Sequence, residues 1–272
     1  MNFRVLLLLI GLMVSTASVV SYADDEPDPL NPSVAPPRLY VGPVVGYNKV
    51  FQTGNFLSFS DPVRCPTFKD GSGNGYFGGI TAEFLIGDPK NSKASIIVRA
   101  VYNNMPSSFT EEGDNLPSLV IQDGKQIVIR TTTQHVAEIQ YTTADLEIMY
   151  KLNLGNSPLV IMAGLAPGFA IKKHIEQRFE LISPDNVQFV PGTDPKVTYD
   201  PFFRKATVQD GDIPNAAGLR FAIKAGVGYE FILKKIFVVP SVNYNFGLTN
   251  MTTTESWKVS ALQAQIDIRF AL

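Results

Sequence analysis

Two histidines are the first candidates for chemistry, because histidine is the side chain most often used as a general acid or base. The 272-residue chain contains only His135 and His174. His135 follows the threonine-rich stretch 131–134, and no nucleophile motif accompanies it. We therefore expect no enzymatic activity, and we interpret both histidines as solvated side chains at the ends of neighbouring elements.

Three other motifs offer ligand chemistry. Asp210-Gly211-Asp212 presents two carboxylates, which is weak evidence for a Ca²⁺ site. The glycine-rich stretch 71–75 resembles a phosphate-binding turn, but no helix follows it as such a turn requires. Cys65 is the only cysteine, so a disulfide within one chain is excluded and a free thiol or a bond between chains remains. The sequence thus predicts no metal ion and no cofactor.

A larger set of charged residues alternates with apolar neighbours along the chain. Five are basic and five are acidic: Arg99, Lys151, Arg220, Lys224 and Arg269 against Glu83, Asp145, Glu147, Glu230 and Asp267. Because an unpaired buried ion costs several kcal/mol, equal numbers of opposite charges suit an enclosed space in which they pair. These ten residues are the candidate site, and their position depends on the elements that carry them.

Alternation with period two predicts that these elements are β-strands. In 219–233 every second residue is apolar or aromatic, and in 262–272 an apolar face opposes Gln263, Gln265, Asp267 and Arg269. Similar patterns occur in six further stretches: 38–50, 75–87, 93–104, 144–153, 159–171 and 238–248. The chain is therefore predicted to be all-β with eight strands.

The turns between these strands fix their register. A two-residue connection at 234–235 pairs Leu233 with Ile236, and a four-residue turn pairs Leu154 with Leu159. Both pairings put apolar residues opposite each other, whereas a slip of one residue would oppose the two faces. The second register offsets His135 from His174 by four residues, or about 13 Å, which is too far to share a metal ion.

Loop lengths alternate between long and short and predict the topology. The expected connections are 51–74, 88–92, 105–136, 155–158, 172–217, 234–235 and 249–256. This is the pattern of an antiparallel up-and-down barrel with long external loops and short periplasmic turns. Within the second long loop, Asp123-Gly124 predicts a hairpin over 119–130 that projects from the barrel.

Composition and the first residues indicate where such a barrel belongs. The chain is 45% hydrophobic but only 18% charged, and its net charge of −2 argues against nucleic-acid binding. Residues 1–23 combine Arg4, an apolar run and small residues before a cut between Ala23 and Asp24, as in a secretory signal peptide. Residues 24–37 then form an acidic, proline-rich periplasmic tail, and 38–272 form the barrel.

Alternation alone does not say which face meets lipid, since a lipocalin-like soluble barrel has the same period with its apolar residues inside. The long loops at one end, the amphipathic last strand with Phe270, and the small residues on the polar face favour a transmembrane barrel. We expect aromatic girdles near the strand ends, formed by Tyr40, Tyr47, Phe84, Tyr102, Tyr150, Phe169, Tyr229, Phe231, Tyr244, Phe246 and Trp257.

Five segments carry a resemblance to a known family: 146–151, 162–168, 226–230, 244–250 and 266–270. In these the chain resembles the PorT-type outer-membrane β-barrel domain family, and the likeness covers most of residues 38–272. The resemblance implies an outer-membrane location. Some members of that family serve protein secretion, and most members have no assigned activity.

With the apolar faces outward, the ten charges point into the barrel. The short turn at 88–92 places Glu83 diagonal to Arg99, within reach of long side chains. The set is then a structural plug of salt bridges, or alternatively a narrow polar path or a proton relay. We expect a structural or surface-interaction barrel whose partners are outer-membrane lipid, the barrel assembly machinery through the last strand, and an extracellular or secretion-machine protein. A small-solute channel is the alternative.

Overall fold

The computed structural model describes residues 37–56, 67–89, 91–122, 125–190, 195–233 and 236–272, with side chains placed except at 114–122 and 126. The predicted signal peptide, most of the tail and Cys65 lie outside these ranges. The described part is all-β, and its strands are β1 (Leu39–Phe56), β2 (Phe68–Ile86), β3 (Ala94–Asn104), β4 (Ser107–Gln122), β5 (Lys125–Asn153), β6 (Leu159–Ser183), β7 (Thr198–Tyr199), β8 (Lys205–Asp212), β9 (Leu219–Tyr229), β10 (Phe231–Leu233), β11 (Ile236–Gly247) and β12 (Lys258–Ala271).

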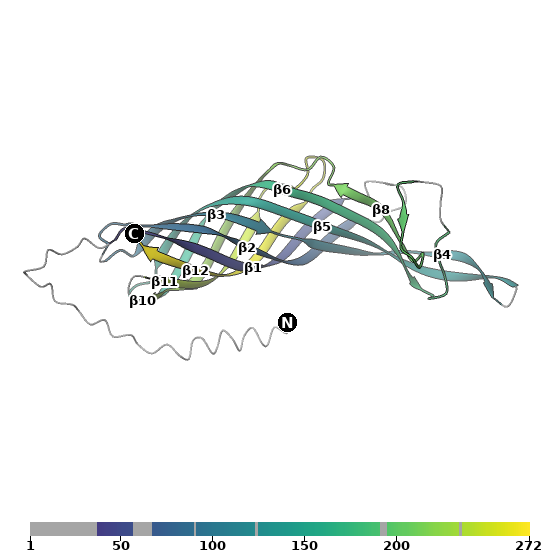
Figure 1. Cartoon of the computed structure of the whole chain (residues 1–272), viewed down its shortest axis with the longest axis horizontal. Coiled ribbons are helices and arrows are strands. Elements are labelled where there is room, and N and C mark those ends of the chain that lie inside the picture. Colours follow the sequence, from purple (N-terminus) through teal and green to yellow (C-terminus); the bar gives the residue numbers. More distant parts are fainter. Residues whose placement is uncertain (1–36, 57–66, 90, 123–124, 191–194, 234–235) are drawn as a thin grey trace, which may run out of the picture. The chain divides into compact units, whose positions relative to one another are not determined.

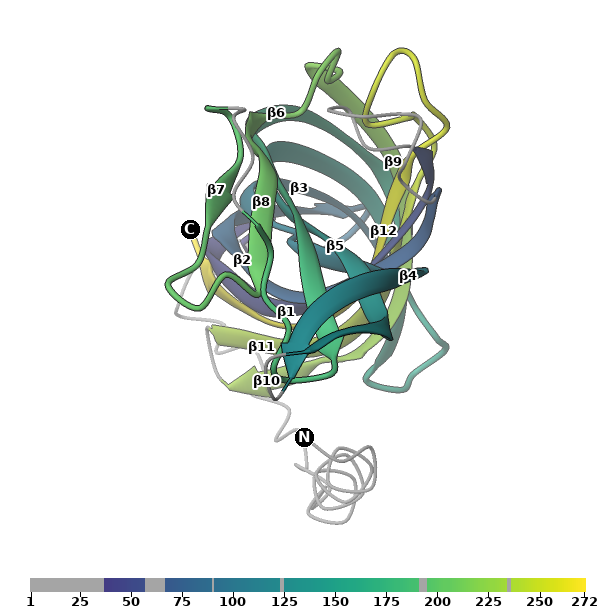
Figure 2. The ribbon, with the colours of Figure 1, turned by 90° about the vertical axis from the view of Figure 1, so that its right-hand side faces the viewer.

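Eight of these strands close into a ring (Figures 1 and 2). Each pairs antiparallel with the next ring strand along the chain, in the order β1, β2, β3, β5, β6, β9, β11 and β12, and β12 pairs with β1. The prediction of an eight-stranded antiparallel up-and-down barrel is thus confirmed. One end of the barrel carries the short connections, the start of β1 and the end of β12, and we call it the turn end. We call the opposite end the loop end.

Both predicted registers are present. Leu233 pairs with Ile236, and the same register continues to Gly247 opposite Ala222. The Leu154 amide donates to the Leu159 carbonyl, and β5 and β6 keep that register as far as Thr143 and Ala170. There one extra residue on β6, Ile171, shifts the ladder by one position. The two histidines are therefore offset by five residues and not by the predicted four.

The predicted long loops are wrong in extent, because much of each is strand. β1 and β2 continue into 51–74, β4 and the start of β5 occupy most of 105–136, and β6 and β8 occupy much of 172–217. The predicted hairpin over 119–130 is part of the longer β4–β5 hairpin, in which Gln122 pairs with Lys125.

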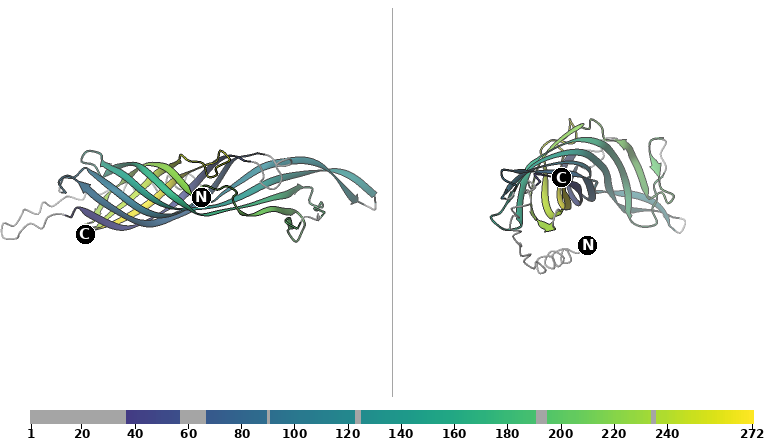
Figure 3. Two further views of the ribbon diagram at one scale, coloured as in Figure 1. Left: turned by 90° about the horizontal axis from the view of Figure 1, so that it is seen from above. Right: turned by 60° about the vertical axis from the view of Figure 1, so that its left-hand side comes forward.

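We call β4, residues 125–140 of β5, residues 172–183 of β6, β7 and β8 the outer sheet. Its strands pair in the order β4, β5, β6, β8 and β7, and Figure 3 shows them running on from the ring. β5 has 29 residues, which is about 95 Å of extended chain. Since about 9–11 residues are enough to cross a bilayer, more than half of β5 lies beyond any such span.

The predicted strand 219–233 is interrupted at Glu230, between β9 and β10. The register places Tyr229 opposite Pro240, and proline has no amide hydrogen to donate to the ladder. Beyond this pair, the Glu230 amide donates to the Pro158 carbonyl in the neighbouring turn. The interruption thus lies where sequence alternation alone could not show it.

The outer face of the ring is a belt of exposed apolar side chains. Representative members on adjacent strands are Val45, Ile80, Val98, Ile148 and Leu165, all well exposed. No helix among the described residues has the length and apolarity to cross a bilayer. Most predicted girdle aromatics are exposed or half-buried on this face. The prediction of a girdle position is wrong for Tyr40 and Trp257, because both are buried inside the barrel.

Inside the ring, side chains are arranged in layers, which can be followed along β12. From the turn end the inward residues are Arg269 and Asp267, then Gln265 and Gln263, then Ala261, Val259 and, just before the strand, Trp257, all buried. Charges therefore lie toward the turn end, amides in the middle, and an apolar cluster at the loop end. A lipocalin-like arrangement would reverse this, with the apolar faces inside.

Candidate functional site

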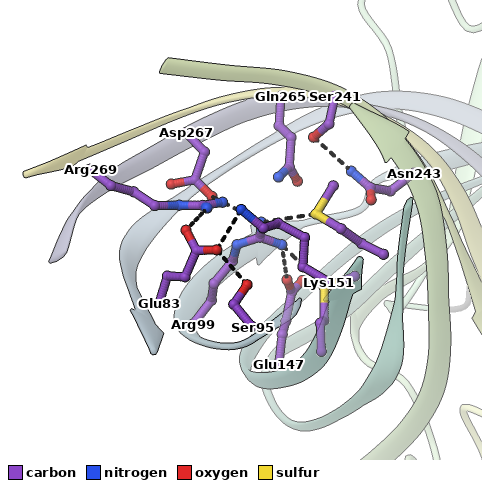
Figure 4. A network of polar contacts seen from close by, with 12 residues as sticks. Glu83, Ser95, Arg99, Glu147, Lys151, Ser241, Asn243, Gln265, Asp267 and Arg269 are labelled. Carbon is purple, nitrogen blue, oxygen red and sulfur yellow. Dashed lines mark hydrogen bonds and ion pairs between the residues drawn. The ribbon is translucent and has the colours of Figure 1, made fainter. Parts of the chain in front are cut away.

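All ten predicted interior charges are buried within the barrel. Eight of them join by ion pairs into one continuous series, which we call the ion chain: Glu230, Lys151, Glu83, Arg269, Asp267, Arg99, Glu147 and Lys224. Acid and base alternate along the whole series, so every inner member contacts two groups of opposite charge. Figure 4 shows its central part crossing the space between opposite strands.

The contacts in the ion chain are short. Lys151 Nζ lies 2.6 Å from Glu83 Oε1 and 2.7 Å from Glu230 Oε2. Asp267 Oδ2 accepts from Arg269 at 2.6 Å and from Arg99 at 2.9 Å. At the other end Glu147 accepts from Arg99 at 3.2 Å and from Lys224 at 2.7 Å. Four bases thus neutralise four acids in a space that excludes solvent.

The expected pairing of Glu83 with Arg99 is wrong, although the register behind it is present, with Thr81 opposite Arg99. Glu83 contacts Arg269 and Lys151 instead. The β1–β12 register places Gly42 opposite Arg269, between the strands that carry Arg269 and Glu83. A Cβ atom at Gly42 would lie 1.8 Å from the Ile268 carbonyl oxygen, so glycine permits the close approach of β1 to β12 at this point. The Arg269 guanidinium reaches across β1 to the Glu83 carboxylate.

Arg220 and Asp145 are not members of the ion chain. Arg220 Nη2 donates to Asn245 Oδ1 at 2.7 Å and to the Val259 carbonyl at 2.9 Å. Asp145 Oδ2 accepts from Asn103 at 2.7 Å. Asn103 in turn accepts from Asn48, and Asn48 accepts from Gln263, at 2.7 and 2.8 Å. This amide layer separates the ion chain from the loop end.

Four rings close the barrel above the amides: Phe56, Phe68, Phe109 and Trp257, which we call the aromatic cluster. Phe56 stacks on Trp257 with ring centres 4.2 Å apart, and Phe109 meets both edge-on. Trp257 Nε1 donates to Gln52 Oε1 at 3.0 Å, which joins the cluster to the polar layer. Sequence reasoning missed this cluster because three of its rings lie in stretches interpreted as loops.

The other candidate motifs are not brought together. The interpretation of His135 as a solvated side chain is wrong, because it is buried against the Phe179 ring. His174 pairs with Asp210 at 2.9 Å on the surface of the outer sheet. The glycine-rich stretch 71–75 is part of strand β2. Across the described ranges, no group of three or more His, Cys, Asp or Glu residues is arranged to hold a metal ion.

A second polar cluster crosses the outer sheet at Glu180. Its carboxylate accepts from Arg178 at 2.6 Å on β6 and from Gln134 at 2.7 Å on β5, and Lys205 Nζ on β8 lies 3.2 Å away. Partial burial favours the neutral acid, but these hydrogen bonds and the charge of Lys205 outweigh it and lower the pKa of Glu180. The cluster therefore holds three strands together while Glu180 is ionised.

We expect the β6–β8 pairing to weaken in acid. A carboxyl group with a lowered folded-state pKa contributes stability above its unfolded pKa, near 4.5, and loses it as the pH falls further. Between pH 6 and pH 3 the amides of β8 should lose protection against hydrogen exchange, once the rates are corrected for intrinsic exchange. The loss should be up to about tenfold for each unit by which the fold lowers the pKa of Glu180. Glu180→Gln should be weakly protected at both pH values, and Glu176→Gln should behave as wild type. An acid-insensitive wild-type β8 would contradict this prediction.

Arg204 organises the connection between β6 and β8. Its guanidinium donates to five backbone carbonyls, those of Leu181, Ile182, Pro184, Asp185 and Val187. Asp200 Oδ1 accepts from the amides of Arg204 and Lys205 at 2.6 Å each. The neighbouring side chains of Phe202 and Val190 are 71% and 88% exposed. The described part of this connection is thus hydrogen-bonded around Arg204 and presents apolar groups to solvent.

Arg204→Lys is expected to loosen this connection. Lysine lacks the planar fork of donors, so it cannot reach five carbonyls at once. With each hydrogen bond contributing about 0.5–1.5 kcal/mol, loss of two or three should raise the rate of limited proteolysis within 184–203 by about tenfold or more. Arg130→Lys, at an exposed position, is the matched control. Equal cleavage rates for both variants and wild type would exclude this role of Arg204.

Comparison with known proteins gives likeness only at the level of fold. No protein-family model and no curated sequence matches the chain. Among solved structures it is similar to Neisserial surface protein A (13% identity, 86% of this chain and 97% of that chain, TM-score 0.31) and to Ail, the attachment invasion locus protein of Yersinia pestis (9%, 85% and 98%, TM-score 0.35). It is also similar to the outer membrane protease OmpT of Escherichia coli (9%, 89% and 99%, TM-score 0.32).

Proposed function

We propose that the protein is an outer-membrane barrel with a closed interior, whose outer sheet binds a protein partner outside the membrane. The barrel is an anchor, and it has no catalytic role. The observation that carries this proposal is the combination of an apolar outer belt with a sealed, charged interior. Neither a soluble carrier nor an open pore needs both features.

The belt supports a membrane location. Exposed side chains such as Val45, Ile80 and Leu165 surround the ring, and such a surface is far larger than a water-soluble monomer usually exposes. The interior instead holds buried ions and amides. In lipid, a closed barrel satisfies every backbone group while it places apolar side chains outward.

The interior supports an anchor rather than a channel. The ion chain fills the section toward the turn end, and the aromatic cluster closes the loop end. Eight strands leave an interior about wide enough for side chains alone. The long outer sheet, with the hydrogen bonds of Arg204 and the exposed Phe202, remains as the surface on which a partner would bind.

The test has two stages. First, the purified chain should insert into lipid vesicles and migrate differently on gels before and after heating, and a soluble product without heat-modifiable migration would overturn the proposal. Second, two variants remove 107–139 or 184–203, each closed with a short glycine linker, and are compared with wild type for binding to cells or to co-purified envelope proteins. Unchanged binding after both deletions would exclude the β4–β5 hairpin and the β6–β8 connection as the binding surface.

Conductance in a planar bilayer separates the anchor from the small-solute channel. An anchor should give no discrete current steps, and regular steps from wild type would favour the channel. The PorT-type resemblance extends the proposal to a component of a protein secretion machine. That extension predicts partners of the cell envelope that co-purify with the wild-type chain and are lost with the outer sheet.

A further inference from the structure

A shallow groove, open to the outside and about 540 Å³ in volume, interrupts the apolar belt on the outer face of β2, β3, β5 and β6. Its floor is formed by small outward residues, Gly78, Ala100 and Ala144. The strand register makes Ala100 the diagonal neighbour of both others, because Ala100 pairs with Ile80 and Leu146. The floor is therefore continuous across three strands.

Large exposed side chains form the walls. Tyr102 lies between Gly78 and Ala144 in the same row, and Phe169 follows Ala144. Ile80 and Leu146 flank Ala100 toward the turn end. Gly78 is open enough that a Cβ atom there would meet nothing nearer than 3.8 Å. The side chains that line this groove on its outer side are apolar apart from the Tyr102 hydroxyl. The carboxylate of the adjoining Asp145 turns inward to Asn103.

A positive charge lies just beyond the groove toward the loop end. Lys172 pairs with Thr142, two residues along β5 from Ala144, which is about 7 Å. Lys172 is exposed, and the exposed Asp212, opposite His174, is its diagonal neighbour on β8. No ion pair joins these two side chains among the described residues, and the carboxylate of Asp210 contacts His174. The exposed Tyr76 lies in the same row through Asn104. A tyrosine and a lysine at this level suit the polar boundary of a membrane leaflet.

From this arrangement we infer that the groove binds one acyl chain of a phosphate-bearing lipid, with Lys172 at the phosphate. This rests on the proposed membrane location. The acyl chain matches the apolar lining of the groove. The positive charge of Lys172 complements a lipid phosphate, whereas a simple hydrocarbon offers no group that would pair with it. A second copy of the chain is the competing occupant, and the test reports it separately.

The test uses the full chain refolded in non-ionic detergent and native mass spectrometry with dipalmitoyl phosphatidic acid or dipalmitoylglycerol. Gly78→Leu and Ala144→Leu fill the groove, and Ala225→Leu, at an exposed small residue of the belt on β9, is the matched control. Filling should reduce retention of both lipids by about tenfold, whereas Ala225→Leu should retain them as wild type does. Lys172→Ala should weaken phosphatidic acid about fivefold, the effect of roughly 1 kcal/mol for one basic residue, and leave dipalmitoylglycerol unchanged.

The outcomes separate this inference from the proposed function. Wild-type retention in Gly78→Leu and Ala144→Leu, or equal loss in Ala225→Leu, overturns the groove as a lipid site. A wild-type dimer that becomes monomeric in Gly78→Leu assigns the groove to a second copy instead. Each variant is first checked for vesicle insertion and heat-modifiable migration. Failure of wild type at that step defeats the membrane proposal, whereas normal insertion with unchanged lipid retention defeats only this inference.

Discussion

Replacing Glu147 by glutamine should lower the free energy of unfolding by about 3–5 kcal/mol, the range measured when one partner of a buried ion pair is removed. Glu147 is fully buried and contacts both Lys224 and Arg99. In the variant Arg99 keeps Asp267, whereas Lys224 has only neutral partners: the glutamine amide oxygen, Gln265 at 3.4 Å and the face of the Phe77 ring. The variant thus leaves a desolvated ammonium group without its counter-ion.

The double variant Glu147→Gln/Lys224→Met should recover much of this loss, because it removes the uncompensated charge together with its partner. Glu176→Gln, at an exposed carboxylate 3.6 Å from Arg178, should change stability by less than about 1 kcal/mol. Urea unfolding from lipid vesicles, followed by circular dichroism, measures all three variants. A loss in Glu147→Gln no larger than in Glu176→Gln would show that the ion chain contributes little to stability.

Trp257→Ala should cost about 3–5 kcal/mol, as large-to-small changes of buried aromatics do. The side chain is fully buried, stacks on Phe56 and donates to Gln52. Its removal opens a cavity between rings held by different strands, and it leaves the Gln52 oxygen without that donor. Since Trp257 is the only tryptophan, unfolding must be followed by circular dichroism or by gel migration.

Trp257→Phe keeps an aromatic ring in the cluster, while it loses the hydrogen bond and the pyrrole part of the indole. Its expected cost is less than half that of Trp257→Ala. Tyr244→Ala, on the outer belt, is the control for loss of an aromatic that faces outward. If Trp257→Ala and Tyr244→Ala had equal effects, the aromatic cluster would have no special role in closing the barrel.

The ring and its interior charges follow from local pattern. Alternation with period two places Glu83, Asp145 and Arg269 on one face, and short turns set the register by arithmetic. The partner of Glu83 does not follow in this way. Arg269 reaches it across β1, and this depends on three strands brought together only by ring closure.

The extent of the outer sheet does not follow from the sequence pattern, for a different reason. Residues such as Thr131, Gln134 and Glu180 pair across strands without apolar alternation, because polar side chains occupy both faces of this sheet, including buried positions such as Thr131. A polar strand and a polar loop have similar composition, so only the ladder with its neighbours distinguishes them. Trp257 was misplaced for a similar reason, since its burial depends on Phe56, Phe68 and Phe109 in stretches without strand periodicity.

The unbroken course of β5 and β6 has a mechanical consequence. Both strands run from the ring into the outer sheet, so a pull on that sheet along their length is transmitted directly to the barrel wall. Their ladder extends over twenty paired positions and would be loaded in shear, with many hydrogen bonds strained together. A partner that pulls on the outer sheet would therefore have to extract the whole barrel from its surroundings before these two strands separated.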